Sequence, residues 1–231
     1  MKNLLELLFP TPPSCVLCER KAVQRGFCKL CWESLELIDD QQRCERCGRA
    51  WSEKGTCSDC RRRSDTYFVC NRSAVQYNDK MKEMISLYKF RGLELLAASL
   101  ALFLEQAYRT HYTELHFDAI TFVPLHEKRL QERGFNQAEQ LARILGKRVN
   151  IPVYSLLTRI RYTEKQSKKG RQARLEVLGE SFAALPIPPS SPSIKRVLLV
   201  DDIYTTGSTL NQCAKILADQ GLLVYTLTIA R

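Results

Sequence analysis

The feature that most constrains the fold is a stretch near the C-terminus, 196–210, which reads RVLLVDDIYTTGSTL. Its apolar residues 197–200 form a short continuous run, which is typical of a strand buried on both faces. Two carboxylates follow, then a turn of small hydroxyl residues, then a helical pattern. The N–H groups of such a turn and the following helix N-terminus can hold a phosphate. The stretch therefore predicts a parallel α/β domain with a phosphate cradle.

The two carboxylates, Asp201 and Asp202, cannot bind a phosphate themselves. They suit a neighbouring diol, such as ribose hydroxyls, or a metal ion held between several ligands. The alternative interpretation is an ordinary strand-to-helix turn that a Thr or Ser caps. The sequence contains no G-x-x-x-x-G-K-[ST] motif, which argues against a motor ATPase.

This arrangement of an apolar strand, an acidic pair and T-T-G-x-T resembles the 5-phosphoribosyl-1-pyrophosphate (PRPP) motif of the type I phosphoribosyltransferases. The resemblance implies that Asp201 and Asp202 hold the ribose diol and, directly or through water, Mg²⁺. It also implies a cradle for the 5'-phosphate, formed by Thr205, Thr206, Gly207, Ser208 and Thr209.

Eight of the ten cysteines form four C-x-x-C pairs near the N-terminus. A shift of 29 residues places every cysteine of the first two pairs on a cysteine of the second two, so the segment is an internal repeat. It predicts two tandem C-x2-C-x9-C-x2-C modules. The pairs are Cys15/Cys18, Cys28/Cys31, Cys44/Cys47 and Cys57/Cys60.

Four thiolates on two short turns can converge on one Zn²⁺ with tetrahedral geometry. Because all four ligands come from the protein, each zinc is expected to be structural, and it supplies much of the folding free energy of so short a segment. The equal spacing favours sequential sites. An interleaved arrangement, in which the first pair shares a metal with the third, stays open.

Two interpretations stay open for the other side chains of this module. Its aromatic residues Trp32, Trp51, Tyr67 and Phe68 could stack on nucleic-acid bases, or they could pack against the zinc knuckles. Its basic residues could bind phosphates or form a solvated face; they are Arg43, Arg46, Arg49, Lys54, Arg61, Arg62 and Arg63.

Composition sets wider bounds. A chain of 231 residues can form one core and a small appended module, and its formal net charge of +10 favours anionic partners. Paired cysteines indicate metal binding in a reducing compartment. Residues 1–10 show no secretory signal, and the longest mainly apolar stretch is too short to span a bilayer. These features predict a cytoplasmic protein without a transmembrane segment.

Hydrophobic periodicity organises the rest of the chain. It predicts a short strand at 75–78, helices at 79–90 and 93–108, a buried strand at 118–124, a helix at 137–147 and a last strand at 222–229. The expected domains are a double zinc ribbon at 1–70 and an α/β domain at 71–231.

The segment 125–137, LHEKRLQERGFNQ, is expected to be a loop after the buried strand. Loops that follow the strand C-termini of a parallel sheet build its ligand site. This one offers Lys128, Arg129 and Arg133, and Gly134 lets the backbone come close to a ligand.

The sequence PLHEKRLQERGFNQA, with YKFRG at 88–92 and the N-terminal LLFP before the first C-x-x-C, is similar to the ComF family of phosphoribosyltransferase-like proteins. The resemblance covers nearly the whole chain. It implies an α/β fold: a type I phosphoribosyltransferase-like domain with a mostly parallel central sheet, preceded by a small double zinc-ribbon domain. It also implies that Arg129 and Arg133 face pyrophosphate.

The basic segment 159–174 reads as a mobile loop, and its place matches the flexible catalytic loop of phosphoribosyltransferases. The resemblance implies that Lys165, Lys168 or Lys169 closes over the leaving group. The alternative is an exposed charged loop without a ligand. A Pro/Ser linker, 186–193, leads into the central strand.

Two hypotheses for function follow. The resemblance favours a PRPP-binding competence factor that handles single-stranded DNA on the cytoplasmic side of DNA uptake, together with a helicase-like ATPase. Peripheral contact with the membrane stays open. The intact acidic motif also allows a salvage or biosynthetic phosphoribosyltransferase that transfers ribose 5-phosphate from PRPP to a nucleobase or amine. Whether catalytic turnover occurs is left open by the sequence.

Overall fold

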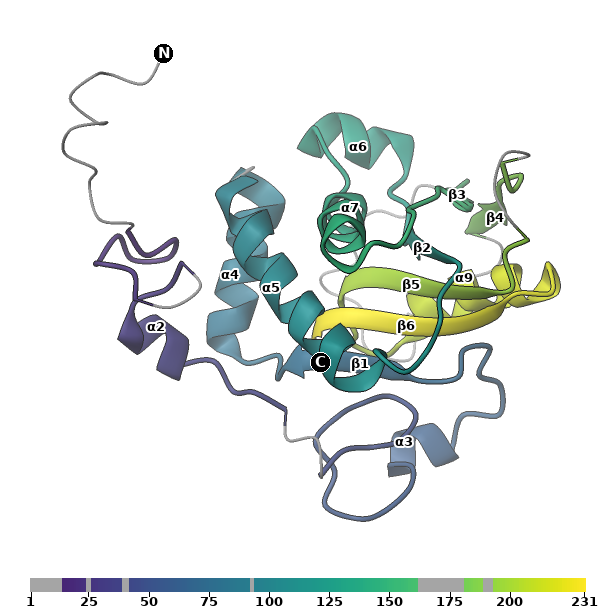
Figure 1. The fold of residues 1–231 in the computed structure, drawn as a ribbon, viewed down its shortest axis with the longest axis horizontal. Helices are drawn as coiled ribbons and strands as arrows, with labels where there is room; N and C mark the ends of the chain where they lie inside the picture. The colour runs from purple at the N-terminus through teal and green to yellow at the C-terminus, as the bar shows by residue number, and fades with distance from the viewer. Residues whose placement is uncertain (1–13, 24–25, 39–41, 92–93, 162–180, 189–192) are drawn as a thin grey trace.

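The computed structural model describes residues 14–23, 26–38, 42–91, 94–161, 181–188 and 193–231 (Figure 1). The expected basic loop is described only at 159–161, and the expected linker only at 186–188 and 193. Lys165, Lys168 and Lys169 lie outside the described residues.

A four-stranded sheet forms the centre of the molecule, in the order β1-β6-β5-β2. All three neighbouring pairs are parallel, which confirms the expected mostly parallel sheet. Strand β5, the apolar run of the sequence, lies between two neighbours, and its residues 197–200 are fully buried. The strands are β1 (Asn71–Val75), β2 (Ala119–Phe122), β5 (Arg196–Ile203) and β6 (Leu223–Ala230).

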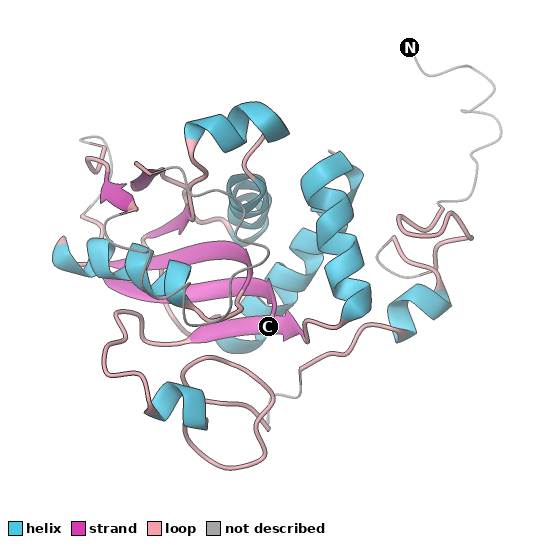
Figure 2. Ribbon diagram, turned by 180° about the vertical axis from the view of Figure 1, so that it is seen from behind, coloured by secondary structure: helices cyan, strands magenta, loops and turns pink. Residues whose placement is uncertain are grey.

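Helices cover both faces of the sheet (Figures 1 and 2). Helices α5 (Glu94–His111) and α7 (Gln137–Val149) pack on one face, with α4 (Asp79–Arg91) beside α5. Helix α9 (Ser208–Asp219) covers the opposite face. Each of these helices was expected from its apolar periodicity, and each buries its apolar side in one continuous core.

The first strand was predicted in the wrong place, at 75–78 instead of Asn71–Val75. Its buried positions include polar side chains, so the sequence shows no apolar alternation there. The hydroxyl oxygens of Ser73 and Thr228 lie 2.6 Å apart, and Asn71 Nδ2 donates to Ser73 Oγ at 3.0 Å. These hydrogen bonds replace the apolar contacts that the prediction relied on.

Two further elements differ from the prediction. The segment expected to be a loop contains helix α6 (Glu127–Arg133), which His126 caps and which ends at Gly134 with a left-handed φ of 79°. This helix buries none of its residues, so it shows no apolar stripe. The antiparallel strands β3 (Leu157–Arg159) and β4 (Phe182–Ala184) were not predicted. They are short and far apart in the sequence, so no local pattern indicates that they pair.

The two cysteine modules are repeats in structure as well as in sequence. In the first, Cys15 N donates to the carbonyl of Arg20; in the second, Cys44 N donates to that of Arg49, the equivalent position. Each module ends in a short helix, α2 (Lys29–Glu33) or α3 (Ser58–Arg61). We call them the first knuckle (residues 14–33) and the second knuckle (residues 43–61).

Candidate metal centres and ligand cleft

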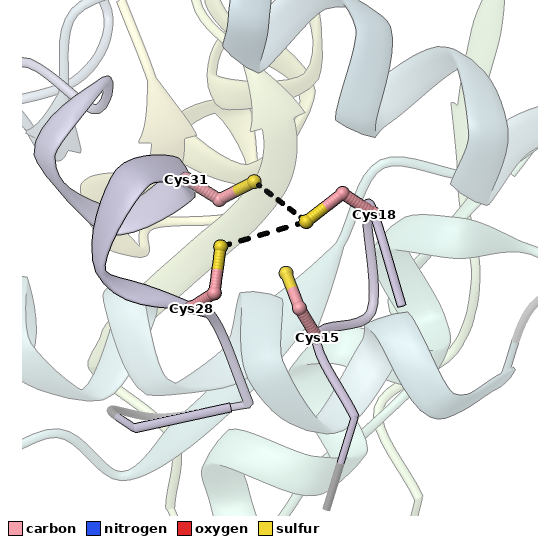
Figure 3. Close-up of side chains that lie close together, drawn as sticks. All are labelled: Cys15, Cys18, Cys28 and Cys31. Atoms are coloured by element: carbon pink, nitrogen blue, oxygen red, sulfur yellow. Dashed lines mark hydrogen bonds between the residues drawn. The ribbon is translucent and has the colours of Figure 1, made fainter. Parts of the chain in front are cut away.

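Each knuckle gathers its four cysteine sulfurs within 4.8 Å of one another. Sulfur-to-sulfur distances are 3.5 Å for Cys18–Cys28 and 3.6 Å for Cys18–Cys31 (Figure 3). Four thiolates placed about 2.3 Å from one Zn²⁺ in a tetrahedron are about 3.8 Å apart, so both clusters fit this ion. The clusters are Cys15, Cys18, Cys28 and Cys31, then Cys44, Cys47, Cys57 and Cys60, so the cysteines gather in the sequential arrangement and not in the interleaved one.

Aromatic residues of the N-terminal module pack inside the protein. Trp32 stacks on Phe103 of helix α5, with ring centroids 5.7 Å apart. Phe68 is buried and meets the ring of Tyr204 edge-on at 6.3 Å. The structure therefore favours the packing interpretation for these two residues over base stacking.

Several basic residues of the module also make contacts within the protein. Arg46 donates to the carbonyl of Cys60 at 2.9 Å, and Arg49 pairs with Asp59 at 3.0 Å. Arg63 donates to the carbonyl of Thr206 in the α/β domain. These arginines are used to assemble the second knuckle and to attach it to the domain, so they form less of a free basic face than the sequence indicated.

A cleft of about 260 Å³ opens at the carboxyl ends of β2 and β5. This is the edge of a parallel sheet at which ligands bind. Four cationic side chains, two carboxylates and one hydroxyl are the charged or hydroxyl-bearing groups that line it: Lys89, Arg129, Arg133, Arg159, Asp201, Asp202 and Thr209. The structure thus brings together the acidic pair and the two arginines that the sequence singled out.

The arginines of the cleft repel one another. Burial, and then the nearby charge of Arg129, lowers the pKa of Arg133, and the same two causes in the same order lower that of Arg159. Arg133 also donates to Gln137 Oε1 at 3.0 Å. A cluster of like charges held this close favours the binding of a multiply charged anion.

The two carboxylates face this cluster from the end of β5. Asp202 is buried, and its Oδ2 lies 2.5 Å from Lys89 Nζ. Asp201 accepts a hydrogen bond from the backbone N–H of Asp202 at 2.9 Å. Burial and the charge of Asp202 raise the pKa of Asp201 to about 7. A metal ion or a donating diol would relieve this repulsion.

The hydroxyl-rich turn connects β5 to α9. Gly207 has a φ of 76°, and a Cβ at this position would lie 2.2 Å from the Tyr204 ring, so a larger residue does not fit. The hydroxyls of Thr206 and Ser208 lie 2.9 Å apart. Thr209 lines the cleft. The four residues that precede Thr209 in the chain, 205–208, are not among the residues that line the cleft.

Sequence reasoning did not assign two cations of the cleft. Lys89 stands in the YKFRG segment at the end of helix α4, and Arg159 was grouped with the basic loop although it is the last residue of β3. One signal could have identified Lys89: this charged residue lies next to Tyr88, on the side of an amphipathic helix that otherwise carries apolar residues. That tyrosine is buried and donates to Gln140 Oε1 at 2.8 Å.

Fold and site together define a phosphoribosyltransferase-like domain that carries a double zinc ribbon. Family models agree: the one described as "Double zinc ribbon domain" matches residues 4–61, and the one described as "Phosphoribosyl transferase domain" matches residues 130–230.

Curated relatives then identify the family. The chain is 33% identical to competence protein ComFC of Bacillus subtilis over 90% of this chain and 89% of that protein. It is 34% identical to ComFC of Streptococcus pneumoniae over 88% and 87%, and 28% identical to DNA utilization protein YhgH of Escherichia coli K12 over 93% and 94%. The chain belongs to the ComF family.

A membrane-spanning helix is not found in the described part of the chain, where even the longest helix lacks the required apolar length.

Proposed function

We propose that this protein is a PRPP-binding competence factor, and that the cleft at the end of β5 is its PRPP site. The observation that carries the proposal is the composition of the cleft, which has a volume of about 260 Å³. Its lining brings two carboxylates together with three guanidinium groups: Asp201, Asp202, Arg129, Arg133 and Arg159. Ribose hydroxyls match the carboxylates, and pyrophosphate matches the arginines. The 5'-phosphate matches the turn at the start of helix α9.

The residues have separate roles in this proposal. Asp201 and Asp202 hold the ribose hydroxyls and Mg²⁺. Bound Mg²⁺ would neutralise pyrophosphate charge as the leaving group departs. Arg129 and Arg133 fix the pyrophosphate from helix α6. Thr205 to Thr209 cradle the 5'-phosphate, with Gly207 allowing the close approach of backbone.

Calorimetric titration of Mg-PRPP into the zinc-loaded protein tests the proposal. The Asp201→Asn/Asp202→Asn double variant should lose affinity, because each lost charge-assisted hydrogen bond costs about 1.5–3 kcal/mol, or roughly ten- to a hundredfold. Lys215→Gln, on the exposed face of α9 and paired with Asp219, is a matched control that should bind like the wild type. Absence of binding by the wild type would reject the PRPP site.

The competence role is proposed from family membership together with the charge. Relatives named as competence and DNA utilization proteins share most of the chain, and the formal net charge of +10 favours a polyanion. We therefore propose cytoplasmic handling of single-stranded DNA, with a helicase-like ATPase as partner. Binding of a fluorescent single-stranded oligonucleotide should weaken steeply as salt rises. A salt-independent affinity, or no binding, would reject this part of the proposal.

A second candidate is a phosphoribosyltransferase acting on a nucleobase or amine. It is favoured by the presence of both carboxylates in the cleft, since binding of an anion alone would need neither. In that reaction the C1–O bond to pyrophosphate breaks, a bond from the acceptor nitrogen to C1 forms, and the acceptor loses a proton. Pyrophosphate release from Mg-PRPP with each of a panel of nucleobases and amines tests it. A panel without turnover would reject it.

A further inference from the structure

Two arginines outside the cleft donate hydrogen bonds to the backbone of the hydroxyl-rich turn between β5 and α9. We call residues 204–208 the phosphate turn. Arg231 Nη1 donates to the carbonyls of Tyr204 at 3.3 Å and Thr205 at 3.0 Å. Arg63 donates through Nη2 to the carbonyl of Thr206 and through Nη1 to the hydroxyl of Tyr204 at 3.3 Å. Three successive carbonyls of the turn are thus occupied from one side.

These contacts determine where the N–H groups of the turn point. In a planar trans peptide, the carbonyl of one residue and the N–H of the next point in opposite directions. Fixing the carbonyls of 204, 205 and 206 toward the arginines therefore turns the N–H groups of Thr205, Thr206 and Gly207 the other way. Among the described residues these three N–H groups have no hydrogen-bond acceptor, so they are available to an anion.

Arg231 contacts the second knuckle, and Arg63 lies just after it in the chain. Arg231 Nη2 donates to Cys47 Sγ at 3.0 Å, so one guanidinium connects a zinc ligand with the phosphate turn. Its carbon Cζ also lies 4.3 Å from the centroid of the Tyr204 ring, the ring that closes against Gly207. Arg63 follows α3 directly along the chain, two residues after its end.

The chain after the second knuckle adds a third link. Asn211 of helix α9 donates through Nδ2 to the carbonyl of Asp65 at 3.2 Å and accepts from Tyr67 N at 3.0 Å. Residues 63–68 therefore run along the turn and the first part of α9. The first knuckle makes its aromatic contacts with helix α5 instead.

We propose that Arg63 and Arg231 are positioning residues of the phosphate cradle, and that zinc in the second knuckle keeps them in place. The inference rests on the proposed PRPP site. Loss of the second zinc releases Cys47 and with it Arg231, and the three peptides of the turn are then free to rotate. Loss of the first zinc leaves the turn as it is.

The repeat supplies matched variants for the test. Cys28 and Cys57 are equivalent ligands of the two knuckles. Arg63→Lys and Arg231→Lys keep the charge but lose the guanidinium fork, which bonds two carbonyls in Arg231 and one carbonyl and one hydroxyl in Arg63. Arg62→Lys, at an exposed neighbour of Arg63, is the conservative control. Each zinc-loaded full-length variant is measured for zinc content, for Mg-PRPP affinity and for the NMR backbone order parameters of the amides of 205–207.

We expect Arg231→Lys and Arg63→Lys each to weaken Mg-PRPP binding roughly tenfold with two zinc ions retained, and to lower the order parameters of amides 205–207. Cys57→Ser should do the same with one zinc lost, whereas Cys28→Ser and Arg62→Lys should change neither. Equal order parameters at 205–207 in Arg231→Lys and the wild type would overturn the inference, as would equal effects of Cys28→Ser and Cys57→Ser.

The order-parameter measurement needs no PRPP, so it separates this inference from the proposed function. Lower order parameters in the arginine variants, with no PRPP binding by the wild type, would support the positioning role and reject the PRPP site. Unchanged order parameters in these variants, with intact PRPP binding by the wild type, would reject the positioning role and support the PRPP site.

Discussion

The two zinc knuckles have the same internal structure, but they are attached to the α/β domain by different kinds of contact. Both form the hydrogen bond from the first cysteine N–H to the residue five positions on, and both place a residue with left-handed φ four positions after that cysteine, Glu19 or Gly48. The first knuckle attaches through rings, from Phe27 and Trp32 to Phe103 of α5. The second attaches through hydrogen bonds to strands and to the phosphate turn.

In the positioning role that we propose, the duplicated module has two uses. An apolar contact is tolerant of small shifts and supplies stability. Hydrogen bonds from guanidinium groups are directional and fix the orientation of the peptides that they meet. A knuckle that only stabilises can be attached by aromatic packing, whereas one that positions a ligand loop needs directional contacts.

The largest expected effect is at the aromatic attachment. Phe103 is fully buried, and its replacement by Ala should reduce the free energy of unfolding by about 3–5 kcal/mol, measured by urea denaturation. Zinc should be lost from the first knuckle only. Phe117→Ala, at another buried ring that packs on Tyr112 and Tyr225, should cost a similar amount and release no zinc. Equal zinc loss in both variants would show that the knuckle does not depend on this contact.

The polar attachment should be weaker. Asn71 donates to the carbonyl of Cys47 at 3.3 Å and accepts from Thr226 Oγ1 at 3.0 Å, in a fully buried position. Asn71→Ala leaves these partners without a hydrogen bond, at a cost of about 1–3 kcal/mol, and zinc should be lost more easily from the second knuckle to a chelator. Asn78→Ala, which removes a helix cap, should leave the zinc of the second knuckle unchanged. Equal chelator sensitivity of that knuckle in the two variants would contradict the attachment.

The acidic pair of the cleft, which belongs to neither attachment, should make the stability of the protein depend on pH. Burial and the charge of Asp202 raise the pKa of Asp201 from its ordinary value of 3.8 to about 7, so the folded state holds this proton more tightly. Stability should therefore fall as pH rises from about 4 to 7. Asp201→Asn should raise Tm at pH 8, on the order of 5 °C for a chain of this size, with the gain disappearing near pH 4. The same gain at both pH values would contradict a raised pKa.

The sequence predicted the parts of the fold that local patterns encode. The apolar run of β5, the periodic helices and the repeated cysteine spacing each indicate one structure by themselves, and the parallel sheet and two sequential four-cysteine clusters are confirmed. Strand β1 was misplaced because its buried Asn71 and Ser73 are stabilised by partners on β6, far away in the sequence.

The candidate site was predictable only where its residues follow one another. Asp201 and Asp202 come directly after β5, and Arg129 and Arg133 share one segment, so motif reading found them. Lys89 and Arg159 also line the cleft, but they come from α4 and β3, where no sequence pattern indicates a ligand site. Arg231 was not predicted at all, because its proposed role depends on contacts with Cys47 and Thr205, which are distant from it in the sequence.

The smallest effect should come from a difference between the knuckles at one equivalent surface position. The second knuckle has Asp59, paired with Arg49 at 3.0 Å, where the first has the exposed Leu30. Both members of the pair are partly exposed, so the pair should contribute only about 0.2–1 kcal/mol and less at high salt. Asp59→Leu, which gives the second knuckle the residue of the first, should therefore leave zinc content and Mg-PRPP affinity unchanged in 0.5 M salt. A loss of either would mean that this ion pair, and not only the two arginines at the phosphate turn, keeps the second knuckle in place.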